Sequence, residues 1–596
     1  MNETQSSAKS SDPSVGPSTA TGVIDGVNGN LIRVVFDQPV MLNEVGYARL
    51  GGKMLKAEIV RIRGKQCWLQ VFEDTAGLRV GGGVTFSSEL LSVELGPGLL
   101  TSIYDGLQNP LPALAEKCGY FLERGEYIDG LDRTAKWDFT PAVSVGDTVQ
   151  AGDTVGTVPE GLFTHRIMVP FGWRGEFTVR EISEAQTCTV DTVVAKVAGA
   201  DGEVREVRLY QTWPVKKPIQ AYEERLRPTE NMTTQVRILD TFFPVARGGT
   251  YCIPGPFGAG KTVLQQITSR RADVDVVIIA ACGERAGEVV ETLREFPELE
   301  DPRTGRSLME RTLIICNTSS MPVASREASV YTAVTLAEYY RQMGLHVLML
   351  ADSTSRWAQA LRELSGRLEE IPGEEAFPAY LESVIASFYE RGGVVRLRDG
   401  SVGSVTIGGS VSPAGGNFEE PVTQSTLKVV GAFHGLSRER SDQRRYPAID
   451  PLESWSKYPS LVDVDKADAA RRVLREGRDV EQMMKVVGEE GTALDDFVLF
   501  LKADFLDEVY LQQDAFHDVD GSSSAERQQH VFGVIHQILM TPLAFESRDA
   551  ARKAFLAWQQ IAKDWNRIPM DADDFTTQER KLIDAVNARR ANAEGN

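Results

Sequence analysis

The sequence predicts a multidomain fold with four parts: a small N-terminal β-barrel, an inserted β-rich module, a central α/β domain with a mostly parallel sheet, and a C-terminal helical domain. Three observations predict it. The length of 596 residues is roughly four times that of a usual single domain. Short β-type runs fill the first third of the chain, and β runs alternate with helical segments in the middle. After Pro459 the β runs cease.

The N-terminal region divides at about residue 20. Residues 1–20 are rich in Ser, Thr, Gly and Pro with almost no large apolar residue, so we expect a disordered tail. The runs Gly22–Val27 and Leu31–Phe36 flank Asn28-Gly29, a strong hairpin signal. Two further β-type runs follow at 57–62 and 66–72. Residues 21–95 are therefore predicted to form the β-barrel.

Residues 115–205 are again β-rich. They contain a near-repeat, Val145–Val149 followed by Ala151–Val155, in which each copy holds a Gly-Asp turn. The segment carries no His, Cys or paired-acid constellation with catalytic or metal-ligand spacing. We expect an inserted module with a structural or docking role.

From residue 210 to 450, apolar β runs alternate with helices such as Arg326–Met343, which predicts a mostly parallel sheet with helices on both faces. The β runs are Thr250–Pro254, Val274–Ala281, Thr312–Cys316 and His346–Ala351. Residues 455–596 are predicted to be helical. Apolar residues recur there at helical spacing, at Leu494, Phe497, Val498, Leu501 and Phe505.

Composition excludes several classes of protein. The 64 Lys plus Arg against 84 Asp plus Glu give a net charge of −20, which opposes binding to nucleic-acid phosphates or anionic lipid. No apolar run approaches the ~20 residues that cross a bilayer, and no signal segment opens the chain. The six Cys lie far apart, so neither a disulfide framework nor a zinc site is indicated. We expect a cytosolic protein able to dock on a membrane complex.

A phosphate-binding loop follows the β run that ends at Pro254. Its backbone N–H groups and the following helix N-terminus would surround the phosphates. Lys261 would reach the β and γ oxygens, and Thr262 would supply a hydroxyl to Mg²⁺. The residues of the Walker A pattern are Gly255, Pro256, Phe257, Gly258, Ala259, Gly260, Lys261 and Thr262, and Val263 opens the helix behind them.

Two carboxylates end neighbouring β runs. Asp352 stands where a Walker B carboxylate holds Mg²⁺, although an Asp capping the next helix is the plainer alternative. Glu284 emerges at the carboxyl edge of the sheet, where it would orient the attacking water, although a Glu opening a helix is more often a dipole partner. Phosphoryl transfer needs positioning more than covalent help, so one such acceptor is sufficient.

With these motifs, the sequence closely resembles the catalytic A subunit of V-type and archaeal-type (V/A) rotary ATPases. The resemblance runs from about residue 21 to about 520. It includes the 115–205 insertion, which in this family is the bulge that F-type β subunits lack. Other matching stretches are Leu239–Pro244, Gly283–Arg285, Glu295–Leu299, Asn317–Ser329, Ala351–Trp357 and Glu420–Gln424.

The resemblance implies an ATP/ADP site with Mg²⁺ in a P-loop domain of the RecA-like type. Glu284 would polarise the hydrolytic water, Arg285 and Arg356 would lie near the phosphates or hold Glu284, and Phe433 would pack on adenine. Thr262 and Asp352 would hold Mg²⁺, and an arginine finger would come from a partner chain. The sequence departs from common family patterns at Ala259, Ala286, Gly287, Asn417 and His434.

The resemblance also implies an assembly. Three copies would alternate with a non-catalytic B subunit of similar size in an A3B3 hexamer, joined to a central shaft, peripheral stalks and a membrane sector that moves H⁺ or Na⁺. The chain would lie on the cytoplasmic face of the membrane. The alternatives are a hexameric P-loop translocase for RNA or for protein export, and a nucleotide-binding assembly subunit without turnover. No nucleic-acid partner is expected.

Overall fold

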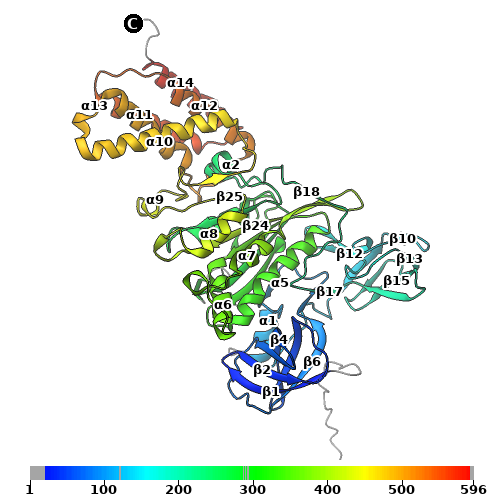
Figure 1. Ribbon diagram of the computed structural model, residues 1–596. Helices are drawn as coiled ribbons and strands as arrows, with labels where there is room; N and C mark the ends of the chain where they lie inside the picture. Colours follow the sequence, from blue (N-terminus) through cyan, green and yellow to red (C-terminus); the bar gives the residue numbers. More distant parts are fainter. Residues whose placement is uncertain are drawn as a thin grey trace, which may run out of the picture.

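A computed structural model describes residues 20–119, 123–285, 287–288, 290, 294 and 296–590. The four parts occur in the predicted order. Figure 1 shows the barrel at one end of the molecule, the C-terminal helices at the other, and the central sheet between them, with the inserted module beside the sheet. The predicted tail over residues 1–20 lies outside the described residues except for Ala20.

The N-terminal strands form a closed barrel with the order β1-β2-β5-β4-β3-β6. The predicted hairpin is confirmed, because Asn28 of β1 pairs with Leu31 of β2. Ala20 is not part of a tail: it is buried and its carbonyl accepts a hydrogen bond from the Phe86 N–H, which extends the barrel by one residue. The strands are β1 (Thr21–Asn28), β2 (Leu31–Phe36), β3 (Glu44–Leu50), β4 (Lys53–Arg63), β5 (Gln66–Val71) and β6 (Gly83–Leu90).

The inserted module consists of two four-stranded antiparallel sheets. The first residues of the predicted range 115–205 are not β-structure, since Leu111–Cys118 forms helix α1. The sheets have the orders β10-β13-β15-β16 and β12-β11-β9-β14. Their strands are β9 (Trp137–Pro141), β10 (Thr148–Val149), β11 (Thr154–Glu160), β12 (Phe163–Met168), β13 (Phe177–Ile182), β14 (Gln186–Cys188), β15 (Val193–Gly199) and β16 (Val204–Arg208).

The near-repeat forms two equivalent turns, as predicted. Gly146 and Gly152 adopt φ of +97° and +87°, a conformation that glycine reaches without a Cβ clash. In each turn the following Asp carboxylate accepts a hydrogen bond from the backbone N–H three residues earlier, at 2.8 Å for Asp147 and 2.7 Å for Asp153. The sequence repeat is therefore a repeat of one turn structure.

The central sheet has ten strands, and its core strands are parallel. Its main order is β26-β25-β19-β24-β22-β20-β21-β8. Two of its strands, β8 (Ile103–Tyr104) and β26 (Trp455–Ser456), come from outside the predicted range of residues 210–450. The others are β18 (Glu224–Leu226), β19 (Thr250–Pro254), β20 (Val276–Glu284), β21 (Thr312–Thr318), β22 (His346–Asp352), β23 (Gly393–Arg396), β24 (Val402–Val411) and β25 (Ala432–Phe433).

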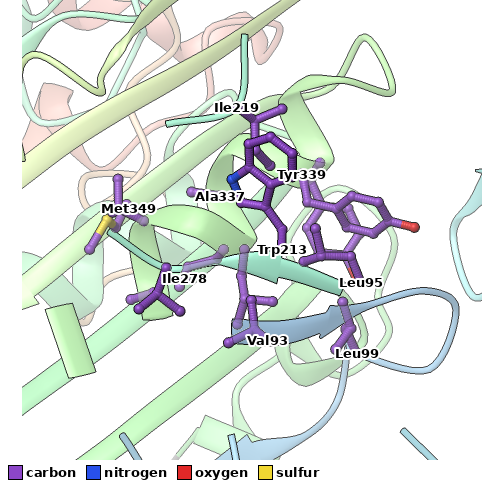
Figure 2. Packing of buried hydrophobic residues seen from close by; sticks show 14 of the residues in the cluster. Val93, Leu95, Leu99, Trp213, Ile219, Ile278, Ala337, Tyr339 and Met349 are labelled. Atoms are coloured by element: carbon purple, nitrogen blue, oxygen red, sulfur yellow. The ribbon is translucent and has the colours of Figure 1, made fainter. Parts of the chain in front are cut away.

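Helices cover both faces of this sheet, as the apolar runs predict. Alternate residues of β22 enter different cores: Met349 packs with α5 (Val323–Arg341) and α6 (Thr354–Arg367), whereas Leu348 packs with α3 (Lys261–Arg271) and the C-terminal helices. Figure 2 shows the first core, in which Ile278 and Met349 of the sheet approach Ala337 and Tyr339 of α5. The two-stranded antiparallel sheet of β7 (Ser92–Leu95) and β17 (Gln211–Pro214) adds to this core, to which the inserted module also contributes.

The C-terminal domain is helical, as predicted, and it starts at α10. Phe497, Val498, Leu501 and Phe505 are buried along one helix, α11. Residues 591–596 lie outside the described part of the chain. The helices are α10 (Val464–Val487), α11 (Leu494–Leu506), a π-helical turn (Asp507–Leu511), α12 (Ala525–Met540), α13 (Arg548–Asn566) and α14 (Asp573–Asn587); α2 (Arg237–Phe242), α7 (Leu381–Tyr389), α8 (Pro421–Val429) and α9 (Arg438–Asp442) precede them.

A buried charge cluster joins the barrel to the central domain. The Lys216 ammonium lies 2.8 Å from a carboxylate oxygen of Glu58 in β4 and 3.3 Å from one of Glu327 in α5. Both carboxylates are buried, and each keeps one oxygen without a hydrogen-bond partner. Burial, together with the charge of Glu327, raises the pKa of Glu58 to about 7, although Lys216 opposes this shift. The cluster thus carries one negative charge in excess at high pH.

We expect Glu58→Gln to stabilise the protein above pH 7. The folded state keeps a proton on Glu58 up to about pH 7, whereas the unfolded chain loses it near pH 4.5, so wild-type stability from this group falls as pH rises between those values. Melting temperatures at pH 4.5–8.5 should diverge progressively, with the variant higher. The exposed Glu123→Gln serves as control. Parallel curves for wild type and Glu58→Gln would contradict the prediction.

Candidate functional site

The phosphate-binding loop joins the end of β19 to the start of α3. Gly258 and Gly260 have φ of +80° and +90°, which other residues adopt only with strain. Between them, Ala259 is buried and its N–H donates to the Pro256 carbonyl. Helix α3 then begins at Lys261, so its free N–H groups and the positive end of its dipole lie at the loop. This geometry can bind an anion.

Lys261 lies across this loop. Its ammonium donates hydrogen bonds to the carbonyls of Gly255 and Pro256, at 2.8 and 2.9 Å. Burial lowers the pKa of Lys261, while the nearby carboxylates of Asp352 and Glu284 oppose that shift. The ammonium is therefore held at the loop by backbone oxygens, within the electrostatic reach of both acidic residues.

Thr262 and Asp352 meet where α3 faces the end of β22. The Thr262 hydroxyl donates to the Asp352 carboxylate at 3.2 Å, and the Ser410 hydroxyl donates to its other oxygen at 2.5 Å. Burial raises the pKa of Asp352, and these two hydrogen bonds counteract the shift. The pair offers two hard oxygen donors beside a phosphate-binding loop. This donor set suits Mg²⁺, which takes few protein ligands and completes its shell with water and phosphate oxygens.

Glu284 is the last residue of β20, the strand next to β22. Its carboxyl group lines a pocket together with Thr262, Asp352 and Glu288. Burial, together with the charges of Asp352 and Glu288, raises the pKa of Glu284 to about 7, although Arg356 acts in the opposite direction. The parallel sheet thus brings Glu284 and Asp352 to one edge, as expected from the order of the strands.

Glu288 also belongs to this acidic group, but it was not among the site residues predicted from the sequence. It lines the same pocket and hydrogen-bonds to Glu284. Its spacing of four residues from Glu284 was the available signal, since a helix opening at Glu284 would place both on one face.

The two predicted arginines have different surroundings. Arg285 stacks its guanidinium 4.6 Å from the ring centre of Phe257, a loop residue that is 77% exposed. Arg356, in the first turn of α6, contacts Gln359 at 3.5 Å and lies close enough to Glu284 to favour its charged form. Arg285 therefore lies beside the phosphate-binding loop, and Arg356 lies near Glu284.

Phe433 lies outside the pocket that holds the acidic residues. It is 5% exposed and packs between Phe418, at 5.6 Å edge to face, and Trp455, at 6.1 Å and nearly parallel. Val263, in the first turn of α3, is 40% exposed. His434 is buried, donates from Nε2 to the Phe243 carbonyl at 2.9 Å, and its ring lies 5.2 Å from that of Tyr251 at a tilt of 39°. The packing of adenine on Phe433 stays a prediction.

Comparison with known proteins shows a match to each part of the fold. The β-barrel domain of the ATP synthase alpha/beta family matches residues 24–88, and the barrel-sandwich domain of its subunits matches residues 128–216. The nucleotide-binding domain of the family matches residues 235–456. The C-terminal domain of V and A type ATP synthase matches residues 464–543.

Curated relatives extend the match to nearly the whole chain. The V-type ATP synthase alpha chain of Treponema denticola is 65% identical over 558 residues, which cover 94% of this chain and 95% of the relative. That of Borrelia duttonii is 60% identical over 571 residues, or 96% and 99% of the two chains. This chain belongs to the V-type ATP synthase alpha chain family.

Membership in the V-type ATP synthase alpha chain family defines the general activity. The chain is the catalytic subunit of a rotary ATP synthase, binds ATP and ADP, and works in a multisubunit complex that makes or hydrolyses ATP. The C-terminal domain matches that of V and A type ATP synthases, so the comparisons do not favour the alternative of a hexameric P-loop translocase for RNA or protein export. No helix within the described ranges has the length and apolar character needed to cross a membrane.

Proposed function

We propose that this alpha chain hydrolyses and forms Mg²⁺-bound ATP at the pocket between its phosphate-binding loop and the end of β20, and that this reaction drives or uses the movement of H⁺ or Na⁺. The observation that carries the proposal is the meeting of Lys261, Thr262, Glu284 and Asp352 at one edge of the sheet. These residue types supply the functions that phosphoryl transfer requires.

Each of these side chains has a separate task. The loop N–H groups bind the phosphates, and Lys261 exchanges its bonds to Gly255 and Pro256 for contacts with phosphate oxygens. The Glu284 carboxylate accepts a hydrogen bond from water and orients it towards the γ-phosphate. Arg285, from beside the loop, and Arg356, from near Glu284, approach the phosphate charge and stabilise it in the transition state.

Thr262 and Asp352 hold Mg²⁺ in this proposal. The ion neutralises charge on the transferring phosphoryl group and fixes its orientation. Ser410 contributes indirectly, since its hydroxyl fixes one Asp352 oxygen at 2.5 Å and so directs the carboxylate. Phe433, with Val263 beside the loop, contributes to the adenine pocket.

We infer the partner subunits from the rotary type of the complex. The chain alternates with a non-catalytic B subunit, which supplies an arginine finger to the site, and the hexamer binds a central shaft, peripheral stalks and a membrane ion-translocating sector. We place it on the cytoplasmic face of the membrane. The choice between H⁺ and Na⁺ belongs to the membrane sector, and synthesis and hydrolysis use the same site.

Asp352→Asn tests the metal-binding part of the proposal. We expect the Mg²⁺ concentration for half-maximal ATP hydrolysis to rise about 10- to 100-fold, because a carboxylate ligand of the ion is lost. Binding of a fluorescent ATP analogue without Mg²⁺ should change less than about threefold, within the range of lost weak contacts.

The control is Asp399→Asn, which removes a surface carboxylate that pairs with Arg166. Its Mg²⁺ dependence should match that of wild type. A wild-type Mg²⁺ dependence of Asp352→Asn would contradict the proposed metal site.

A further inference from the structure

The end of β20 turns at Gly283, directly before Glu284. Gly283 has φ of +78°, in the left-handed region that glycine favours. The side chain of Arg326, from the first turns of α5, fills the space beside it: a Cβ on Gly283 would lie 2.7 Å from the Arg326 Cδ and 2.9 Å from its Nε. Arg326 is 8% exposed, so its stem is packed against this turn.

The guanidinium of Arg326 also holds the turn that follows β21, which lies beside Glu284. Its Nη2 donates to the Ser319 carbonyl at 3.2 Å and lies 3.5 Å from that of Met321. The Ser319 N–H in turn donates to the Glu284 carbonyl at 2.9 Å. Arg326 therefore supports Glu284 from two directions, through Gly283 before it and through Ser319 beside it.

No buried carboxylate among the described residues pairs with Arg326. The nearest acid, Glu363, lies 4.0 Å from Nη1, and its side chain is 46% exposed. The Nε atom is buried without a hydrogen-bond partner, and the positive charge of Arg356 is close. A buried cation with such weak compensation is costly, so stability alone does not explain why Arg326 packs on the Gly283 turn and on the Ser319 carbonyl.

We propose that Arg326 is a positioning residue for the reaction, which fixes the Gly283–Glu284 turn and thereby the direction of the Glu284 carboxylate. This inference rests on the role proposed above for Glu284. The water that Glu284 orients must approach the γ-phosphate in line, and a misplacement of about 1 Å is enough to cost about 100-fold in rate. Arg326 itself touches neither the water nor the nucleotide.

The first test is Arg326→Met in the assembled complex. Met fills the space of the stem and removes the guanidinium, so the turn loses its support through Ser319. We expect kcat for ATP hydrolysis to fall about 10- to 100-fold while KM for Mg-ATP changes less than about twofold. Arg326→Lys, which restores a donor, should recover part of kcat. Glu363→Gln is the matched control and should retain wild-type kcat.

Gly283→Ala tests the same turn without touching Arg326. The added Cβ displaces the Arg326 stem and disfavours the positive φ, so we expect the same loss of kcat with nucleotide binding retained. Wild-type kcat in both Arg326→Met and Gly283→Ala would overturn the inference. A loss in which KM rises in parallel with the fall in kcat would overturn it as well, because that pattern indicates a general disruption of the site.

A double-mutant cycle separates this inference from the function on which it rests. In single-turnover measurements, Arg326→Met should add no further loss in a Glu284→Gln background, because both changes act on the same group. Additive losses would overturn the inference. Full turnover of Glu284→Gln alone would remove the role of Glu284 and this inference with it, whereas wild-type kcat of Arg326→Met beside an inactive Glu284→Gln would overturn this inference alone.

Discussion

Replacement of Glu284 by Gln is expected to reduce ATP hydrolysis by about 10²- to 10⁴-fold while the complex still assembles and binds Mg-ATP. Gln has nearly the same shape as Glu, so the packing at the end of β20 is kept, but the carboxylate that accepts a hydrogen bond from the attacking water is lost. The pKa of Glu284, raised to about 7 by burial and by Asp352 and Glu288, indicates that the free site holds this group close to its titration point.

The measurement is steady-state hydrolysis with nucleotide binding determined in parallel. Glu298→Gln is the matched control, because Glu298 is exposed on the short helical turn Phe296–Glu298 and does not line the pocket. Normal turnover of Glu284→Gln would remove Glu284 from the catalytic role.

Replacement of Lys261 by Met is expected to weaken ATP binding about 10- to 100-fold, since a charge-assisted hydrogen bond contributes about 1.5–3 kcal/mol. Turnover should fall further, by about 10³-fold, because the lysine also stabilises charge that develops on the γ-phosphate. The free energy of unfolding should change by less than about 1 kcal/mol. Burial of the ammonium is unfavourable, as its lowered pKa indicates, and this cost offsets the gain from its two hydrogen bonds to backbone carbonyls.

Isothermal titration with ATP and chemical denaturation would measure the two effects on the same samples. Lys428→Met removes an exposed lysine that pairs with Glu382 on the surface and should match wild type in both. Unchanged ATP affinity in Lys261→Met would show that the loop binds phosphate without this side chain, contrary to the proposed mechanism.

Local sequence patterns predicted most of the nucleotide-binding region. Strand β19 occupies the predicted residues, and the loop glycines adopt the positive φ that their spacing indicates. Helix α5 begins at Val323, three residues before the predicted start, because Pro322 occupies the N-cap position and favours helix initiation just behind it. Such features depend on residues close together in the sequence, so one amino-acid sequence without homologues is enough to predict them.

Features that depend on contacts between residues far apart in the chain could not be predicted from the sequence. The contact of Arg326 with Gly283 joins a helix to a strand end more than forty residues earlier, and the pairing of β8 with β21 joins segments about 200 residues apart. The polar composition of residues 1–20 predicts that Ala20 belongs to a tail, yet Ala20 is buried against the barrel. These placements follow from tertiary packing, which no periodic pattern within one segment encodes.

The site residues divide in the same way. The placement of Lys261, Thr262, Glu284 and Asp352 near one another could be predicted, because each lies at the start or end of an element at the carboxyl edge of a parallel sheet. The proximity of Glu288 to Glu284 depends on how the chain turns after Arg285, and the enclosure of Phe433 by Phe418 and Trp455 depends on β26.

The most direct test of the account is the subunit content and ATPase activity of the complex that a tagged copy of this chain recovers from its own cell membranes. We predict that it is recovered in equal amounts with a second chain of similar size, together with membrane-embedded subunits. Glu284→Gln should reduce the hydrolysis of this assembly by about 10²- to 10⁴-fold without changing its composition. A homohexamer of this chain that hydrolyses ATP, with no second large chain and no membrane subunits, would contradict the account.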